Sequence, residues 1–587
     1  MPDVATEAPE VTRDLRTDPP PTRAPLRRRG RRLLAGAAEA AVALAVGVGF
    51  MLWARNIDVD PMVRIGQVSG LAKLQFRAAL IALPVFAVVL YAAYRSGARH
   101  YRLLLRLGCA AVAGLGTGIV AGGIAVALRG TPWGLGGQDG DPGTLLNYAV
   151  AYLRGEGLPD LYPPGFVWLL AEWTKYGYHT QRAVGFALKD LQLLFSAVFG
   201  PLAYLAWRLL LRPVWALAIA LPAALLFLDP IRPYSHLVMV CLVPLLGRLL
   251  TELARSADLR RRPAGGLRSA VLRGAALGAV LALLFLTYSG WFVWAAPGTL
   301  IAVLALTPWR RGRAALARAA ALLGAAGLAF GAVGAPLLLK FVEHGATTVD
   351  RYAYFDVYVD PAYVMGWRYD HSVWLPSWAW PPPGELAGQS VFSLLVVAGF
   401  ALALALGLRR PAVVAALGCL GGAWVLRFWF AGHMERDQAV MLYPRTTWLI
   451  LYCLIALTVL AAQLLSGAAG SAWRRLTAAR KLRPSGSLGR RLAAGGLCGL
   501  ALFGVMGASW SANRYLPTDP KQHTMGMDAW HAQTLQRADG SCPTYAPDHN
   551  CGAPRGYWKP VDSVITALWC GNVPAPDWPA YCGRPSP

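Results

Sequence analysis

Two carboxylates in a glycine-rich stretch are the residues of this chain best suited to acid–base chemistry. Asp139 and Asp141 lie within residues 136–143, just beyond an apolar run that ends near Leu128. A carboxylate placed where a membrane span meets water can take a proton from a hydroxyl group of a substrate. Asp-Gly and Asp-Pro pairs also favour turns, so a purely structural role in a loop is the alternative.

Basic side chains in other polar segments could bind a phosphate group. Arginine forms paired hydrogen bonds to phosphate and stays charged. The candidates are Arg232, His433, Arg436 and Arg445, with His236 as a further cation when protonated. For each of them, a lipid headgroup contact or a pair with Glu435 or Asp437 is the alternative. Taken together, they predict an anion site near one face of the membrane.

Aromatic residues are concentrated in the same kind of segment. Residues 340–388 are rich in tyrosine and tryptophan, including Trp367 and Trp374, and Tyr148 and Tyr162 follow the two aspartates. Aromatic faces bury the apolar faces of sugar rings, which favours a carbohydrate platform. Aromatic side chains also gather at the membrane interface, and a purely interfacial role is equally compatible with the pattern.

The rest of the chain must hold these residues in a membrane. Hydrophobic residues make up 56% of the sequence and charged residues only 15%, whereas soluble domains carry about 25% charged residues. A membrane-spanning helix needs about 20 apolar residues. We predict an all-α polytopic protein with about thirteen such helices, near residues 35–54, 76–94, 107–128, 190–208, 213–228, 235–252, 272–290, 291–308, 316–339, 390–408, 411–429, 446–466 and 492–509.

The formal charge of +25 has a topological explanation. Arginine clusters fall in alternate loops, and most aspartate and glutamate residues fall in the others. This is the positive-inside pattern, which places the N-terminus in the cytoplasm and the C-terminus outside the plasma membrane. The charge therefore indicates orientation and contact with membrane lipid, and argues against nucleic-acid binding. The basic segment 1–33 is predicted to be a disordered cytoplasmic tail, followed by an uncleaved signal anchor.

The nine cysteines divide into two groups. Five stand singly in apolar runs, where a cysteine is usually a small buried hydrophobe. Cys542, Cys551, Cys570 and Cys582 fall together in the polar tail, which is the 510–587 domain. Outside the cell this group favours two disulfides, whose pairing the sequence leaves open, over a zinc site. Residues 34–509 form the predicted membrane domain, with large outer loops at 129–189 and 340–388. Nucleotide-binding and serine-hydrolase motifs are absent from the sequence.

At this level the chain resembles the GT-C membrane glycosyltransferases. The spans, the acidic first outer loop and the extracytoplasmic tail all have counterparts there. Gly136-Gly137, Asp141 and Tyr148, followed by residues 162–168 beginning Tyr162-Pro163-Pro164-Gly165, are similar to the actinobacterial arabinofuranosyltransferases that prime arabinan on cell-wall galactan. The resemblance implies that Asp141 is the catalytic base, with Asp139 beside it.

The resemblance also implies a substrate class. The expected reaction is inverting transfer of a sugar from a polyprenyl-phosphate donor to a hydroxyl group of an extracytoplasmic glycan. The sugar is arabinofuranose if the nearest resemblance holds, and mannose or another hexose if it does not. A divalent metal is compatible with this chemistry, and the sequence leaves metal dependence open. The alternative is a membrane transporter or a flippase for lipid-linked sugars. Transporters usually carry charged residues inside their spans and repeated halves, and here in-span charges are few (Glu39, Arg208 and Arg248).

Overall fold

Most of the described chain is α-helical. The computed structural model describes residues 24–66, 68–95, 98–131, 134–136, 140–179, 183–256, 266–344, 391–437, 443–479, 486–519, 525–535 and 541–552. Within these residues, ten helices are long and apolar enough to cross a membrane. They are α1 (Ala24–Asn56), α2 (Leu71–Arg95), α3 (Ala98–Ala127), α6 (Val184–Arg208), α8 (Pro233–Ser256), α9 (Gly266–Thr287), α11 (Arg313–His344), α13 (Pro411–Gly432), α15 (Tyr443–Ala479) and α16 (Gly486–Arg514). This confirms the predicted class of all-α polytopic membrane protein.

Three further apolar helices are shorter. They are α7 (Pro213–Phe227), α10 (Gly290–Leu306) and α12 (Val391–Gly407). At 1.5 Å per residue, a helix of about 15–17 residues is roughly 22–26 Å long, which is less than the ~30 Å hydrocarbon thickness. Each of the thirteen predicted ranges overlaps one of the long or short helices. Ten of the predicted spans correspond to helices that are long enough to cross a membrane. The total of thirteen spans stays a prediction.

The polar segments that connect the long helices, and the segment that follows α16, contain small elements. They are β1 (Arg64–Ile65) and β2 (Val68–Ser69), which pair antiparallel, α4 (Gly140–Leu153), α5 (Pro164–Trp173), the π-helical turn η1 (Thr174–Tyr178), α14 (Met434–Asp437), α17 (Met527–Thr534) and the 3-10 turn η5 (Pro547–His549). Most of the predicted helices begin several residues before the predicted ranges, and two cases have a clear reason. The sequence of residues 147–153 predicts a short helix at the membrane interface. In the structure this helix, α4, begins at Gly140, because an acidic residue and a proline both suit a first helical turn. Helix α1 begins at Ala24, inside the segment predicted to be disordered, because arginine, leucine and alanine are strong helix formers.

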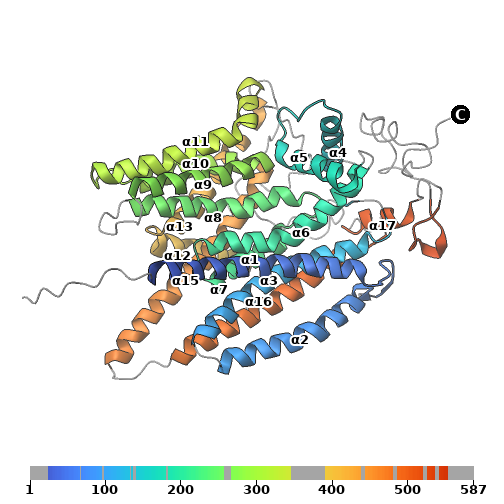
Figure 1. Cartoon of the computed structure of the whole chain (residues 1–587), viewed down its shortest axis with the longest axis horizontal. Helices are drawn as coiled ribbons and strands as arrows, with labels where there is room; N and C mark the ends of the chain where they lie inside the picture. The colour runs from blue at the N-terminus through green and yellow to red at the C-terminus, as the bar shows by residue number, and fades with distance from the viewer. Residues whose placement is uncertain are drawn as a thin grey trace, which may run out of the picture.

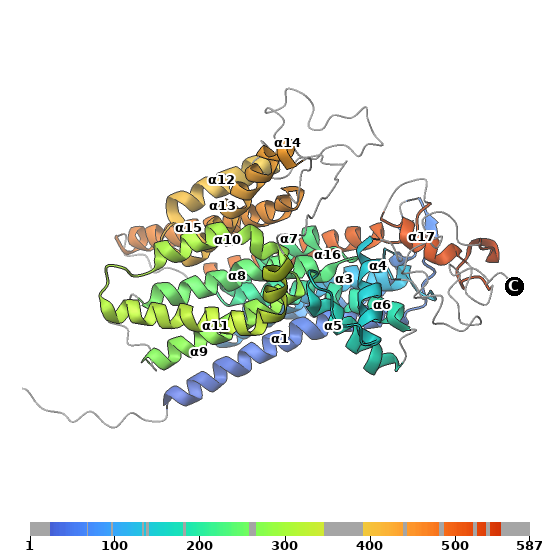
Figure 2. The ribbon, with the colours of Figure 1, turned by 90° about the horizontal axis from the view of Figure 1, so that it is seen from above.

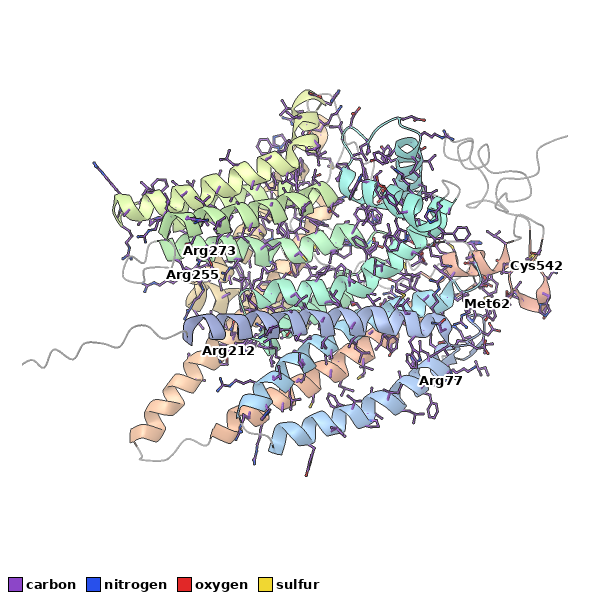
Figure 3. All side chains as sticks on the ribbon, in the orientation of Figure 1. Met62, Arg77, Arg212, Arg255, Arg273 and Cys542 are labelled. Atoms are coloured by element: carbon purple, nitrogen blue, oxygen red, sulfur yellow. A yellow bond between two sulfur atoms is a disulfide. The ribbon has the colours of Figure 1, made fainter. Side chains whose placement is uncertain are left out.

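The long helices run side by side, and several of the small elements lie at one end of the bundle (Figure 1), whereas α14 lies apart from them (Figure 2). Figure 1 shows α4, α5 and α17 at that end, and Figure 2 shows the same grouping from above. In Figure 3, Arg212, Arg255 and Arg273 lie toward the opposite end from Met62 and Cys542. We call the end that carries α4 and α17 the outer end, and the end that carries the three labelled arginines the inner end, following the predicted orientation.

Close backbone contacts and buried polar links hold the bundle together. A Cβ atom at Gly298 of α10 would lie 1.8 Å from the carbonyl oxygen of Gly418 in α13, so these two helices touch through their backbones. Near the inner end, the buried Glu39 of α1 pairs with Arg106 of α3 and Arg208 of α6. Tyr204 of α6 also donates to Glu39, at 2.5 Å. This charged link ties the first helix to two others.

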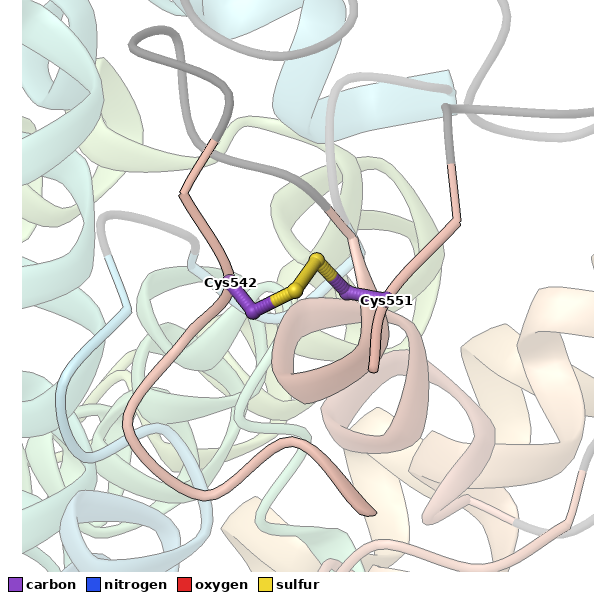
Figure 4. Close-up of a disulfide and its surroundings, with 2 residues drawn as sticks. All are labelled: Cys542 and Cys551. Atoms are coloured by element: carbon purple, nitrogen blue, oxygen red, sulfur yellow. A yellow bond between two sulfur atoms is a disulfide. The ribbon is translucent and has the colours of Figure 1, made fainter. Parts of the chain in front are cut away.

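The cysteines follow the predicted division as far as they are described. Cys542 and Cys551 form a disulfide in the tail (Figure 4). Of the five cysteines in apolar helices, four are buried and Cys498 is half-buried. Cys570 and Cys582 lie outside the described residues, so the second predicted disulfide stays a prediction.

Candidate functional site

Asp141 lies in the first turn of α4, at the outer end of the bundle. Its carboxylate accepts a hydrogen bond from Nη1 of Arg232 at 2.5 Å. Asp229 accepts from Nε of the same guanidinium at 3.2 Å, and its other oxygen accepts from the backbone N–H of Ile231 at 3.0 Å. Burial opposes the charge of Arg232, but Asp229 and Asp141 together raise its pKa above the usual value. Arg232 is therefore a fixed cation shared by two carboxylates.

Gln192 joins the two loops that carry these residues. It is a buried amide in α6, and its Oε1 accepts from the N–H of Leu135 at 3.0 Å. Its Nε2 donates to the carbonyl oxygens of Leu135 and Ile231, at 3.0 and 3.1 Å. The first loop leads into Asp141 and the second contains Arg232. One side chain thus sets the spacing of the carboxylate and the guanidinium.

Gly136 is required where the first loop approaches the second. Its φ of +80° is a conformation that residues with a side chain rarely adopt, and a Cβ there would lie 2.8 Å from Pro142 and 3.0 Å from Ile231. Its N–H donates to Oδ2 of Asp528 at 2.8 Å. Asp528 belongs to α17, so the tail also holds the loop before Asp141. Gln533 of the same helix donates to the carbonyl oxygens of Ala127 and Arg129.

A row of tyrosines lies beside the carboxylates. The rings of Tyr148 and Tyr162 are 5.5 Å apart, and the hydroxyls of Tyr162 and Tyr234 are 2.5 Å apart. The ring of Phe166 stacks on that of Tyr234, with 4.2 Å between the ring centres. The ring centres of Tyr234 and Tyr288 are 6.4 Å apart. Burial raises the pKa of Tyr162, and the charge of Asp141 adds to this effect. The Tyr162 phenol is therefore neutral and lies within electrostatic reach of Asp141.

Arg445 stands at the far end of this row. Its Nη1 donates to the hydroxyl of Tyr288 at 2.9 Å. His236 is buried nearby, with its ring between Trp291 and Trp448 at 5.6 and 5.7 Å. Asp141 and Arg232 are thus paired, and Tyr148, Tyr162 and Arg445 are linked through Tyr234 and Tyr288, although these residues come from separate parts of the sequence.

The other predicted cations belong to a different region. His433 directly follows the last residue of α13, and its Nδ1 lies 2.7 Å from the carbonyl oxygen of Trp429. Arg436 is exposed in α14 and pairs with its neighbour Asp437 at 2.8 Å. Figure 2 shows α14 apart from α4 and α5. Asp139, Trp367 and Trp374 lie outside the described residues, so their places in the site stay predictions.

The residues that sequence reasoning missed are those that position others. Asp229 and Tyr234 belong to the outer segment from which only Arg232 and His236 were predicted to be functional. The role of Gln192 could have been predicted, because a single amide side chain in an apolar span needs hydrogen-bond partners. The role of Asp528 could not have been predicted, since its partner Gly136 is far away in the sequence.

Metal ligands and relatives do not define the site further. In the described part of the chain, no group of three or more His, Cys, Asp or Glu side chains is placed to hold a metal ion. The predicted divalent metal stays a prediction. No protein-family model and no curated protein matches this sequence.

Proposed function

We propose that this protein is an inverting glycosyltransferase that moves a sugar from a polyprenyl-phosphate donor to a hydroxyl group of an extracytoplasmic glycan. The observation that carries the proposal is the Asp141–Arg232 pair. A partly exposed carboxylate is fixed at the outer end of a membrane bundle, beside a row of tyrosines. Inverting transfer from a phosphate requires one carboxylate on the acceptor side, because the phosphate leaves without strong protonation.

Asp141 is the proposed base. Its carboxylate takes the proton from the acceptor hydroxyl, and the acceptor oxygen forms a bond to the anomeric carbon as the bond from that carbon to the donor phosphate oxygen breaks. The electron pair leaves with the polyprenyl phosphate. Arg232 orients the carboxylate, and Asp229 offsets part of the charge of Arg232 so that Asp141 remains able to accept a proton.

Arg445 is the proposed contact for the departing phosphate. It donates to Tyr288 at one end of the tyrosine row, and the phosphate of the polyprenyl lipid is proposed to lie beside it. Arg232 was predicted to share this role, but its two carboxylate partners favour the orienting role instead. Arg436 and His433 stay candidates for a more distant contact with the lipid phosphate. A guanidinium stabilises the negative charge that develops on the leaving oxygen.

Tyr148 and Tyr162 are the proposed contacts for sugar rings, because their rings lie together and Tyr162 is within electrostatic reach of Asp141. Trp367 and Trp374 extend this assignment to the large outer loop. Arabinofuranose is the proposed sugar, on the strength of the family resemblance around residues 136–168. A flippase or transporter is the competing class. The buried acids Glu39 and Glu252 are both paired with arginines near the inner end of the bundle, which does not favour it.

The test is Asp141→Asn in membranes that contain the protein, supplied with a polyprenyl-phosphate sugar and a glycan acceptor. The change keeps the shape of the side chain and removes the basic oxygen. Loss of a general base should reduce transfer roughly 100- to 10,000-fold while donor binding remains. Asp160→Asn is the matched control, because Asp160 is an exposed acid in the same outer segment, paired with Lys340 at 2.7 Å. Full transfer by Asp141→Asn would remove the proposed base and leave the proposal without its main support.

A further inference from the structure

At the inner end of the bundle, three arginines surround one buried acid. Glu252 of α8 has a side chain that is 4% exposed. It pairs with Arg248 at 2.5 Å and Arg255 at 2.7 Å, both from its own helix, and with Arg273 of α9 at 2.8 Å. Two carboxylate oxygens thus hold three guanidinium groups, which leaves a local charge of about +2 at ordinary pH.

Two of the three arginines are fixed but not covered, whereas Arg248 is 29% exposed. The side chains of Arg255 and Arg273 are 58% and 44% exposed. The other buried acid gives a useful contrast, because the arginines on Glu39 are only 24% and 18% exposed and belong to the interior. A guanidinium has five N–H donors, so the exposed Arg255 and Arg273 keep donors that can point to a ligand. The cluster around Glu252 is built to present positive charge rather than to bury it.

An apolar surface begins next to the cluster. Leu272, Ala276, Val280 and Leu283 of α9 are exposed, and their spacing puts them on one face of the helix. The line starts beside Arg273 and runs away from the inner end, into the part of the bundle that hydrocarbon must surround. The fixed cations therefore match the phosphate headgroup of a phospholipid. The apolar face of α9 beside them matches an acyl chain of the same lipid.

We propose that Arg248, Arg255 and Arg273, held by Glu252, form a binding site for the phosphate headgroup of an anionic phospholipid in the inner leaflet, with an acyl chain along the exposed face of α9. Basic clusters between helices on the cytoplasmic side suit such headgroups. The charge excess selects anionic over zwitterionic lipids, since a zwitterionic headgroup brings its own cation to the site. The proposal concerns the inner end and is independent of the chemistry at Asp141.

The test is native mass spectrometry of the purified full-length protein in detergent, titrated with phosphatidylglycerol or phosphatidylcholine. The Arg255→Gln/Arg273→Gln variant removes two cations and keeps the size and polarity of the side chains. Its affinity for phosphatidylglycerol should fall at least about tenfold, because losing even one charge-assisted contact has about that effect. The control is Arg310→Gln/Arg311→Gln, which removes the same charge from an exposed inner loop. Its affinity should stay within about twofold of the wild-type value, since surface charges contribute little individually.

Several outcomes would overturn the proposal. One is equal affinity of the wild-type protein for the two lipids, and another is an equal loss in the control variant, which would indicate charge without a site. Displacement of bound phosphatidylglycerol by excess inorganic phosphate would identify a soluble phosphate as the ligand instead. If the glutamine variant does not fold, the Arg255→Lys/Arg273→Lys variant replaces it. That variant keeps the charge and loses the forked geometry, so it should bind severalfold more weakly, and unchanged affinity would contradict the proposal.

Discussion

At the outer end of the bundle, the arrangement around Asp141 depends on residues that are far apart in the sequence. Arg232 pairs with Asp141 across 91 positions, and Gly136 donates to Asp528 across 392. The residue types were readable from the sequence, because a carboxylate, a guanidinium and tyrosines in outer segments indicate polar chemistry. Their pairing was not, since it is set by how α4, α6 and α8 pack. The role of Gln192 follows from the same packing.

The first prediction at this scale concerns Gly136. Gly136→Ala should lower both stability and transfer, because the new Cβ would meet Pro142 and Ile231 and push apart the loops that hold Asp141 and Arg232. Gly155→Ala is the matched control. Its φ is +85° and nothing lies within 4 Å, so it should show only the cost of the left-handed backbone, about 1–2 kcal/mol. Thermal unfolding and transfer assays on both variants give the comparison. Equal effects on transfer would mean that the contact with Pro142 and Ile231 does not matter.

The second residue-scale prediction concerns the leaving phosphate. Arg445→Ala should weaken use of the lipid donor roughly 10- to 150-fold, because a charge-assisted contact to phosphate is worth about 1.5–3 kcal/mol. Arg436→Ala should have a smaller effect, since that side chain is exposed and already paired with Asp437. Donor titrations of transfer rate measure both. A larger loss in the Arg436 variant would return the phosphate site to α14.

At the scale of elements, hydropathy located the apolar helices of the described residues, and length separated ten long helices there from three short ones. The sequence predicted α4 only in part and did not predict the β1–β2 hairpin, because short elements in polar loops are fixed by tertiary contacts. Helix contacts through glycine were also not predicted. A glycine in an apolar helix gives no sign of whether another backbone passes close to it.

The prediction at this scale compares two helical glycines. Gly298→Ala should destabilise the bundle by about 1–3 kcal/mol or more, because its Cβ would lie 1.8 Å from the Gly418 carbonyl oxygen and α10 would have to move away from α13. Gly324→Ala in α11 has nothing within 4 Å of the new Cβ. It should stabilise the helix by about 0.5–1 kcal/mol, since alanine loses less backbone entropy than glycine. Thermal unfolding in detergent should therefore shift in opposite directions, and a shift in the same direction would contradict the packing of α10 on α13.

For the whole molecule, composition and charge predicted the class and the orientation, and the structure supports the class. The separation of Arg212, Arg255 and Arg273 from Cys542 along the bundle is what the positive-inside pattern requires. The tail lies at the same end as α4 and contacts its loop through Asp528. The proposed site and the tail must therefore face the same side of the membrane.

The topological prediction uses the disulfide. A membrane-impermeant thiol reagent applied to intact cells should label Cys542 and Cys551 only after an external reductant opens their bond. Cys109 and Cys453 are buried within the bundle and serve as internal controls that should stay unlabelled. Labelling of the tail cysteines only after the cells are lysed would place the tail, and with it α4, in the cytoplasm.

The central claim is sugar transfer from a lipid phosphate by means of Asp141. The most direct measurement uses the purified protein in liposomes that contain polyprenyl-phosphate arabinofuranose, with a galactan acceptor on the outer side. We predict that polyprenyl phosphate and arabinosylated acceptor form in equal amounts, and that Asp141→Asn forms neither above background while Asp160→Asn forms both. Movement of intact donor across the bilayer, with no cleavage of its sugar–phosphate bond and no effect of Asp141→Asn, would contradict the account and identify a transporter.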